Sequence, residues 1–432
     1  MQTYDTCKHS GIDWLGEIPG HWELSRIKYL FKEINERSLD GSEDLLSVSQ
    51  YTGVTRKADK LQDGDLLTNA STLDGYKIVR KRQLVSNIML AWNGSLAFSD
   101  FDGITSPAYC IYELTGDDDY KFFHYLFKTD LYKSEFKRNS SGVIESRLRL
   151  YTEDFFNIWS ILPPIHEQEA IAAFLDEKCG KIDALVEIKS QQIEKLKELR
   201  QVKIHQAVTK GLDANVELKD SGIDWIGGIP KHWKVTNFKR ILIGIKDGTH
   251  GTHQRVTNGN LLLSAKNIHN NGIRISGDES MIPDKDYHEI TKNGYPKKND
   301  LLITCVGTIG RTYVYDLEYP LAFQRSVAFL RFNLYRGNPH YFKFYIESPY
   351  YQYILSQLTK TSAQGGVYMG DILKSTIILP PLSEQKNIIA YLDEVTGQID
   401  QAIAQKQEQI EKLKQYKQSL INEVVTGKVK VA

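Results

Sequence analysis

Two long stretches of the chain carry apolar residues at the spacing of an extended α-helix. No proline occurs between residues 167 and 210 or between 384 and 427, and most steps between the apolar positions are 3, 4 or 7 residues. Such steps are typical of the seam of a coiled coil. The pattern therefore predicts long helices over residues 166–211 and 383–432. The expected seam positions are Leu175, Ile182, Leu185, Ile193, Leu196, Leu199, Leu392, Ile399, Ile403, Ile410, Leu413 and Leu420.

The segment before each long helix has a different pattern. Short β-type runs such as LLSVS (45–49) and LLITCV (301–306) are separated by turn signals such as Asp63-Gly64 and Asn258-Gly259. Aromatic-rich segments at 121–136 and 339–358 repeat every three to four residues, which predicts helices. Residues 1–165 and 212–382 are therefore expected to form two mixed α/β domains.

The chain is one unit written twice. SGIDWLGEIPGHW at 10–22 matches SGIDWIGGIPKHW at 221–233 in ten of thirteen positions, at an offset of 211. A longer match joins 161–211 to 378–428 at an offset of 217, and both segments begin with ILPP followed by EQ. The blocks between the matching ends differ sharply. Each copy therefore keeps its two ends and changes its middle.

The long helices are expected to pair with each other. A helix of about 40 residues extends about 60 Å and cannot bury its apolar stripe on one small domain. An antiparallel pairing suits the short linker at 211–217, since a parallel one would require the chain to travel the length of the pair. The predicted fold is α+β, with two domains joined by an antiparallel coiled coil and a pseudo-two-fold internal repeat. Lys189 and Lys406 interrupt the seam at matching positions.

The composition is that of a soluble globular protein. Lys plus Arg and Asp plus Glu both number 54, which argues against a uniformly basic nucleic-acid binder and leaves local basic patches open. There is no run of 18 apolar residues and no signal-peptide pattern at the start, so we expect no membrane association. The four cysteines form no CxxC pair, which favours free thiols in a reducing cytoplasm.

No motif for catalysis or metal binding is evident. The sequence has no GxxxxGK[ST] loop, no GxGxxG after a strand and no HExxH. The residue before the paired prolines is Leu162 or Leu379, so LPP is not the Asn/Asp-Pro-Pro-aromatic motif of amino-methyltransferases. His250 and His253 are three residues apart but have no third ligand nearby. We expect no catalytic residues and no metal site.

Three segments carry a local basic excess that could meet DNA. Lys and Arg exceed Asp and Glu by 11 to 7 over 236–314, by 7 to 4 over 56–82 and by 5 to 2 over 132–149. Glycine allows close backbone approach, lysine suits phosphates, and Arg, Asn and Gln can read base edges. The candidate DNA-binding residues of the first half are Asn69, Ser71, Thr72, Tyr76, Lys77, Arg80, Lys81, Arg82, Arg147 and Arg149. Those of the second half are Lys246, Asp247, Gly248, Thr249, His250, Thr252, His253, Lys266, Arg311, Gln324 and Arg325.

Together these features resemble the specificity subunit of type I restriction-modification systems. The resemblance rests on SGIDW and IPxHW at the start of both halves and on LPPxxEQ at the head of both helices, and it covers essentially the whole chain. The KDGTHGTH loop at 246–253 is also similar to one in the family's target-recognition domains. The first half lacks such a loop.

The resemblance implies a non-catalytic DNA-specificity subunit. Residues 1–165 and 212–382 would be target-recognition domains, each reading one half of a bipartite double-stranded DNA target. The helices at 166–211 and 383–432, the central and C-terminal repeated regions, would space the half-sites and dock two methyltransferase subunits. Those subunits would carry S-adenosylmethionine, and two restriction subunits using ATP and Mg²⁺ would join a cleaving complex. This chain itself would bind no cofactor.

Two other classes of function stay open from the residues alone. The chain could be a coiled-coil scaffold with two protein-binding heads, or a self-sufficient methyltransferase or nuclease. A neighbouring gene for a methyltransferase with an Asn-Pro-Pro-Phe-like motif would favour the specificity subunit.

Overall fold

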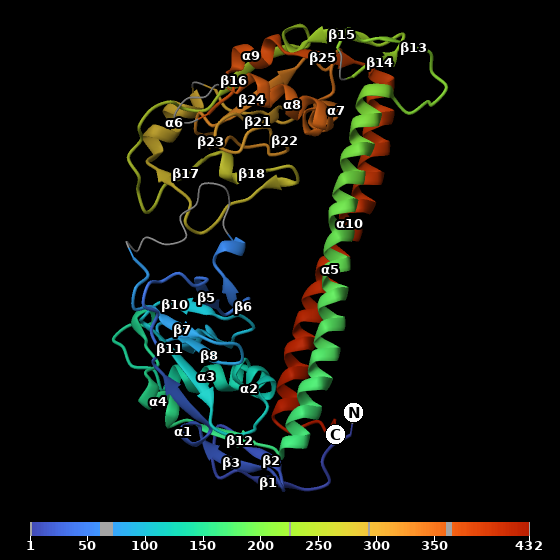
Figure 1. The fold of residues 1–432 in the computed structure, drawn as a ribbon. Helices are drawn as coiled ribbons and strands as arrows, with labels where there is room; N and C mark the ends of the chain where they lie inside the picture. Colours follow the sequence, from blue (N-terminus) through green and yellow to red (C-terminus); the bar gives the residue numbers. More distant parts are fainter. Residues whose placement is uncertain (1, 61–71, 224–225, 293, 360–364, 432) are drawn as a thin grey trace. The chain divides into compact units, whose positions relative to one another are not determined.

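The computed structural model describes residues 2–60, 72–223, 226–292, 294–359 and 365–431. The chain divides into two compact units, each with one head and one half of each long helix (Figure 1). Unit 1 comprises Met1–Lys189 and Glu408–Ala432, and unit 2 comprises Ser190–Gln407. Helices and strands both contribute to each head, as expected for an α+β fold.

The head of unit 1 is built on a four-stranded antiparallel sheet in the order β4-β11-β8-β9. Ile111 of β11 pairs with Ile34 of β4 and with Val85 of β8, which fixes the register. Four further strand pairs, β1-β2, β3-β12, β5-β6 and β7-β10, extend this head. The strands of unit 1 are β1 (Cys7–His9), β2 (Glu17–Pro19), β3 (Glu23–Arg26), β4 (Phe31–Ile34), β5 (Leu46–Ser49), β6 (Gly53–Arg56), β7 (Lys77–Val79), β8 (Leu84–Asn87), β9 (Leu96–Phe98), β10 (Gly103–Thr105), β11 (Tyr109–Leu114) and β12 (Trp159–Leu162).

Short helices cover the sheet of unit 1 with aromatic side chains. Asp119 and Thr129 cap the helices α2 and α3 by accepting hydrogen bonds from backbone N–H groups of the first turn. Phe122, Phe123 and Phe127 are buried in one core with residues of both long helices. The short helices are α1 (Ile27–Leu30), α2 (Tyr120–Phe127), α3 (Asp130–Arg138) and α4 (Thr152–Phe156), with 3₁₀ turns η1 (Ala58–Lys60), η2 (Ala91–Asn93) and η3 (Glu145–Arg147).

The head of unit 2 repeats this framework and adds to it. Its four-stranded antiparallel sheet has the order β16-β24-β21-β22, and helix α7 packs on β21 and β22 as α2 packs on β9 in unit 1. A second sheet, β20-β17-β23, contains one parallel pair, and β13-β14, β15-β25 and β18-β19 are two-stranded. The strands are β13 (Leu218–Asp220), β14 (Gly228–Pro230), β15 (Lys234–Asn237), β16 (Leu242–Asp247), β17 (Asn260–Leu263), β18 (Ile268–His269), β19 (Gly272–Ile273), β20 (Met281–Ile282), β21 (Leu301–Thr304), β22 (Thr312–Val314), β23 (Ala322–Phe323), β24 (Val327–Phe332) and β25 (Thr376–Leu379). The short helices are α6 (Asp284–Lys292), α7 (Pro339–Glu347), α8 (Pro349–Leu358) and α9 (Met369–Lys374), with 3₁₀ turns η4 (Phe238–Arg240) and η5 (Ala265–Asn267).

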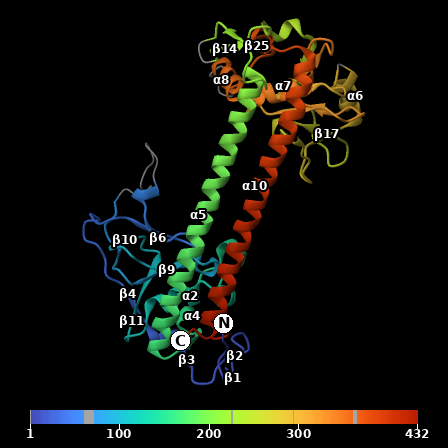
Figure 2. The same ribbon diagram turned by 90° about the vertical axis from the view of Figure 1, so that its right-hand side faces the viewer.

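The long helices α5 (Ile165–Lys210) and α10 (Leu382–Val425) lie side by side within each unit (Figures 1 and 2). In unit 1, Lys417 Nζ donates to Asp183 Oδ2 (2.7 Å) and Lys189 Nζ donates to Gln409 Oε1 (2.7 Å). In unit 2, Lys406 Nζ donates to Gln192 Oε1 (2.6 Å), and the side chains of Arg200 and Asp400 form an ion pair (3.3 Å). Residue numbers rise along one helix as they fall along the other, so the two helices run antiparallel in each unit.

The buried stripe of these helices differs from the predicted one at two positions. Leu185 and Leu199 are 46% and 43% exposed, whereas Ile182 and Ile193 are buried. The contacting positions alternate in steps of four and three and include Val186 and Arg200, each one residue beyond an exposed leucine. One residue turns the helix by about 100°, which carries Leu185 and Leu199 off the stripe. The contacting positions of α5 are Leu175, Cys179, Ile182, Val186, Lys189, Ile193, Leu196 and Arg200. Those of α10 are Leu392, Thr396, Ile399, Ile403, Lys406, Ile410, Leu413, Lys417 and Leu420.

The second long helix also ends earlier than the sequence suggests. Helix α10 stops at Val425, and Gly427 then adopts a positive φ of 74°. The Lys430 backbone N–H donates to the Gln2 carbonyl oxygen (2.8 Å), so the two ends of the chain lie together in unit 1 (Figure 2).

A carboxylate in the first turn of each long helix holds the start of its own head. In unit 1, the Trp22 indole donates to Glu167 Oε2 (3.0 Å), Tyr4 Oη donates to the same oxygen (2.8 Å), and His21 contacts Oε1. In unit 2, the Trp233 indole donates to Glu384 Oε2 (2.9 Å), and the ring of His232 contacts Oε1 (2.6 Å). We call these contacts the two latches.

The glutamine after each latch carboxylate ties in a third segment. Gln168 Nε2 donates to the Pro163 carbonyl oxygen (2.9 Å), and Gln168 Oε1 accepts from the backbone N–H of Asp119, the cap of α2 (2.9 Å). Gln385 does the same with Pro380 (2.9 Å) and with Asn338, the cap of α7 (2.8 Å). The repeated IPxHW and LPPxxEQ motifs are therefore structural: they join chain start, head helix and long helix.

The tryptophans of the repeated motifs differ in how deeply they are buried. Trp22 and Trp233 are completely buried and anchor their heads, and Trp14 packs partly buried against the core of unit 1. Trp225 lies outside the described residues.

The latch of unit 1 predicts a loss of stability in acid. Burial alone would raise the pKa of Glu167, but hydrogen bonds from His21, Trp22 and Tyr4 outweigh it and hold that pKa below the usual value. A lowered carboxyl pKa contributes stability at pH above about 4.5, and the contribution is lost as pH falls through the folded-state pKa.

We expect Glu167→Gln to lower the free energy of unfolding near pH 7 by about 1–3 kcal/mol and to flatten its dependence on pH below about 5. Glu169→Gln, an exposed carboxylate in the same turn, is the matched control and should leave the curve unchanged. Urea unfolding followed by circular dichroism at several pH values measures both. Equal curves for wild type and Glu167→Gln would contradict the role of the latch.

Candidate nucleic-acid interface

The predicted 246–253 segment of unit 2 forms the rim of a cavity of about 230 Å³. It begins in the last two residues of β16, and the backbone beyond them pairs with the segment after β23. The Thr249 N–H donates to the Phe323 carbonyl oxygen (2.8 Å), and the Arg325 N–H donates to the Thr249 carbonyl oxygen (3.0 Å). The structure thus brings Gln324 and Arg325 to the 246–253 segment, which the sequence placed about 70 residues away. The remaining lining comes from the end of the described part of α6, from the segment after it and from the two strands β23 and β24 with the residue before β23. These residues are Glu289, Ile290, Gly294, Tyr295, Pro296, Leu321, Phe323 and Phe329.

Gly248 is the tightest point of this segment. A Cβ atom at Gly248 would lie 2.1 Å from the Phe323 carbonyl oxygen, a distance that real side chains do not tolerate. Gly244, four residues earlier in β16, has open space where its Cβ atom would lie. Glycine at 248 therefore permits the backbone pairing that places Arg325 beside Thr249.

Both histidines of the segment are held by carboxylates. His250 Nε2 contacts Asp247 Oδ2 (2.7 Å), and His253 contacts Asp286 Oδ2 through Nδ1 (3.0 Å) and Thr249 Oγ1 through Nε2 (2.9 Å). Asp286 comes from α6, and sequence spacing gave no signal that it would meet His253. His250 is exposed, whereas the His253 side chain is only 13% exposed, so His250 and Thr252 face solvent and His253 supports the segment.

The other candidates of unit 2 form a separate group. Arg311 follows a turn in which Gly307 and Gly310 both have positive φ, and its backbone N–H donates to Thr304 Oγ1 (3.0 Å). Lys266 makes an ion pair with Glu279 (2.9 Å), and this contact raises the pKa of Lys266. Burial, and then the positive charges of Arg274 and Arg311, lower the pKa of His269.

The candidates of unit 1 do not form one cluster. Arg80 is held by both carboxylate oxygens of Glu36 (2.7 and 2.8 Å), and the Lys81 N–H donates to Asp102 Oδ1 (2.8 Å). Arg82, at a positive φ of 68°, places its guanidinium 5.5 Å from the centre of the Tyr120 ring. Thr72, Arg147 and Arg149 are exposed and Tyr76 is half-buried. Asn69 and Ser71 lie outside the described residues.

Lys77 is a correction to the predicted set. Its side chain is 7% exposed and pairs with Glu33 (3.5 Å), because strand β7 turns it toward the sheet. It cannot reach a DNA phosphate in this arrangement. The basic character of 56–82 was therefore overestimated by sequence counting, since Lys77 and Arg80 each already have a carboxylate partner.

Neither a metal centre nor a membrane-spanning helix is present in the described ranges. No group of three or more His, Cys, Asp or Glu side chains there is placed to hold a metal ion. No helix in these ranges has the length and apolar character needed to cross a bilayer. The four cysteines are free thiols.

Comparisons with known proteins all point to the same family. Residues 256–412 match the family model for the type I restriction modification DNA specificity domain. The type I restriction enzyme MjaVIII specificity subunit of Methanocaldococcus jannaschii is 25% identical, over 96% of this chain and 94% of that one. The EcoKI specificity subunit of Escherichia coli K12 is also 25% identical, over 71% of this chain and 65% of that one.

Two solved structures share the fold. One, described as the structural basis of complex assembly and conformational transition of the type I R-M system, has a TM-score of 0.70 at 16% identity and covers 95% of this chain and 99% of that one. The HsdS subunit from Thermoanaerobacter tengcongensis has a TM-score of 0.52 at 17% identity, with 95% and 98% coverage. The repeated motifs, the family model and full-length relatives all indicate a specificity subunit of a type I restriction-modification system, a class of subunit that is non-catalytic.

Proposed function

We propose that this subunit reads a bipartite double-stranded DNA target, one half with the head of each unit. The observation that carries the proposal is that the two heads share one framework and differ in their exposed loops. Both have a four-stranded sheet, a capped aromatic helix and a latch to the long helix, but the 246–253 segment has no counterpart in unit 1. A shared framework that carries different exposed loops is suited to reading two different half-sites.

In this proposal α5 and α10 form an antiparallel coiled coil that sets the gap between the half-sites. The contacting positions of the two helices correspond at the offset of 217 residues, as Leu175 does to Leu392 and Lys189 to Lys406. The polar contacts between the two helices follow the same offset. The contact of Lys189 with Gln409 corresponds to the contact of Lys406 with Gln192. Such matching supports an internal pseudo-two-fold repeat, and polar seam residues favour one register over others.

The second head is proposed to contact DNA through the exposed rim of its cavity. His250, Thr252 and Arg325 are exposed there, and the backbone pairing at Gly248 holds them together. Arginine can read guanine through two hydrogen bonds, and histidine and threonine can reach base edges or phosphates. In the first head the exposed candidates are Thr72, Arg80, Lys81, Arg82, Arg147 and Arg149.

The chemistry is assigned to partner subunits. We propose that two modification subunits, which use S-adenosylmethionine, dock on this chain, and that two restriction subunits using ATP and Mg²⁺ join them in a cleaving complex. Phosphate contacts shared with such partners would account for a specificity subunit whose own net charge is zero. A cytoplasmic location follows from the same proposal, because the target is cellular and incoming DNA.

The proposal is tested by sequencing the methylated positions of the genome with and without this gene. We expect one bipartite, adenine-methylated motif to disappear on deletion and to return on complementation. An unchanged set of methylated motifs would overturn the proposal and favour a scaffold with protein-binding heads.

A paired substitution tests the second reading surface. Gly248→Ala places a Cβ against the Phe323 carbonyl and should displace the rim, whereas Gly244→Ala in the preceding strand β16 meets open space. We expect Gly248→Ala to lower methylation of the motif by about tenfold or more, the order of losing one bidentate base contact. Gly244→Ala should retain wild-type methylation. Equal activity of the two variants would contradict a role for this rim in DNA reading.

A further inference from the structure

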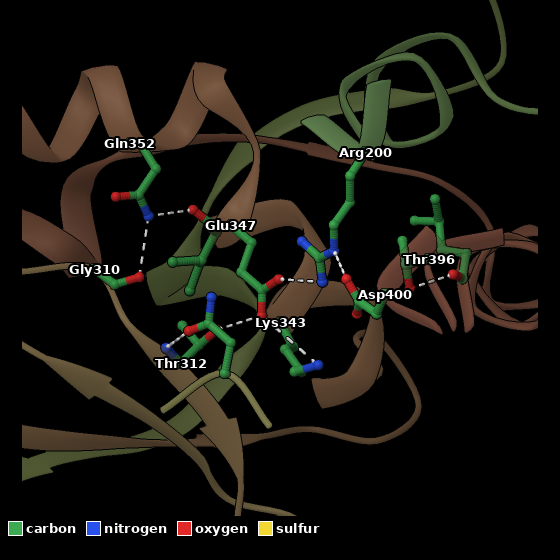
Figure 3. A network of polar contacts seen from close by, with 11 residues as sticks. Arg200, Gly310, Thr312, Lys343, Glu347, Gln352, Thr396 and Asp400 are labelled. Carbon is green, nitrogen blue, oxygen red and sulfur yellow. Dashed lines mark hydrogen bonds and ion pairs between the residues drawn. The ribbon is translucent and has the colours of Figure 1, made fainter. Parts of the chain in front are cut away.

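A chain of polar contacts in unit 2 leads from the long helices to the segment that carries Arg311 (Figure 3). Arg200 of α5 lies between two carboxylates. Its Nε is 3.3 Å from Asp400 Oδ1 of α10, and its Nη2 is 3.6 Å from Glu347 Oε2 at the end of α7. Glu347 Oε1 then accepts a hydrogen bond from Thr312 Oγ1 (3.3 Å), and Thr312 directly follows Arg311.

A second contact holds the other side of Arg311. Gln352 of α8 donates from Nε2 to the Gly310 carbonyl oxygen (3.0 Å) and to the Ile346 carbonyl oxygen (2.7 Å), as Figure 3 shows. Gly310 has a positive φ of 84°, and a Cβ there would lie 2.6 Å from Gln352 Oε1. The residues before and after Arg311 are thus both fastened to the α7–α8 segment.

Burying the charged Glu347 carboxylate at this position is unfavourable, so net stability alone does not explain its presence. Its side chain is 2% exposed, and burial raises its pKa in spite of the nearby Lys343 and Arg200. Its Oε2 lies 3.6 Å from Arg200 Nη2, and its Oε1 lies 3.7 Å from Lys343 Nζ. Within the described residues, neither Glu347 Oε2 nor Arg200 Nε makes a hydrogen bond. A buried ion pair of this kind contributes little net stability, but it tolerates few alternative placements of its two elements.

Unit 1 lacks this bridge although its framework is the same. Lys417 is the counterpart of Arg200 at the 217-residue offset, and it is held by Asp183. Lys128 follows α2 where Glu347 ends α7, and a capping residue comes next in both heads, Thr129 and Ser348. Burial and then the charges of Lys417 and Lys133 lower the pKa of Lys128 to about 8. At this pair of positions, the attraction between Glu347 and Arg200 in unit 2 is replaced by repulsion between Lys128 and Lys417 in unit 1.

We propose that Arg200 and Glu347 are positioning residues for target reading by the second head. They fix the Arg311 segment relative to α5 and α10, and so set which bases the second half-site must contain without contacting DNA themselves. This inference rests on the proposed function of the chain as a reader of a two-part target. It assigns the second head a buried ionic link to α5 at a position where the first head carries Lys128. In the first head, Lys121 and Tyr125 of α2 instead contact Asp176 of α5 (2.5 and 2.8 Å).

The test uses the complete complex with its modification subunits and a library of target DNAs with single mismatches in either half-site. The measured quantity is discrimination, the ratio of methylation rates on matched and mismatched DNA. We expect Glu347→Gln and Arg200→Met each to lower discrimination at the second half-site by about tenfold, with the first half-site unchanged. Lys417→Met, the matched control in unit 1, should change neither ratio by more than about twofold.

Discrimination separates positioning from simple loss of structure. A variant that is merely less stable loses activity on matched and mismatched DNA together, which leaves the ratio as in wild type. Thr312→Val provides a second variant that keeps both charges and removes only the hydroxyl contact, and it should shift the same ratio. Unchanged discrimination in Glu347→Gln and Thr312→Val, or equal changes at both half-sites, would overturn the inference. If the wild-type complex methylates no two-part target, the proposed function itself fails.

Discussion

One carboxylate in the first turn of each long helix determines how each head is mounted. Glu167 and Glu384 each accept an indole N–H from a fully buried tryptophan that lies about 150 residues earlier in the chain. The adjacent glutamine fixes the cap of an aromatic-rich helix of the head, α2 in unit 1 and α7 in unit 2. These contacts join the beginning, middle and end of each repeat at one point. A carboxylate at a helix N-terminus is also favoured by the helix dipole.

This mounting separates two requirements that otherwise conflict. The ends of each repeat must stay constant to preserve the latch and the contacting stripe of the helices, while the exposed loops between them are free to change. The second head uses that freedom to add a sheet, β20-β17-β23, and the 246–253 segment, whereas the first head has the two-stranded sheets β5-β6 and β7-β10. The same framework also accepts opposite charges at Lys128 and Glu347, so the connection of a head to its helices can itself differ between the units.

The sequence was most informative where its patterns are local or repeated. Helix α5 begins within one residue of its predicted start, and the duplicated motifs identified the parts that became the latches. Leu185 and Leu199 were wrongly assigned to the seam because apolar character alone does not separate two neighbouring faces of a helix. The positions that contact the other helix also include two charged residues, Lys189 and Arg200. Lys77 was wrongly expected to be exposed because charge does not reveal which way a strand faces. The sequence did not indicate a role for Asp286 or Glu347, because each depends on a partner that is distant in sequence.

The central claim is that two DNA-reading heads are spaced by α5 and α10. The most direct measurement inserts one heptad into both helices between Ser190 and Gln191 and between Gln407 and Glu408, positions that preserve the alternation of steps on each side. Sequencing the methylated motif then measures the gap between its half-sites. The insertion adds about 10 Å of helix, so we expect the gap to lengthen by up to about three base pairs. A methylated motif with an unchanged gap would contradict the account.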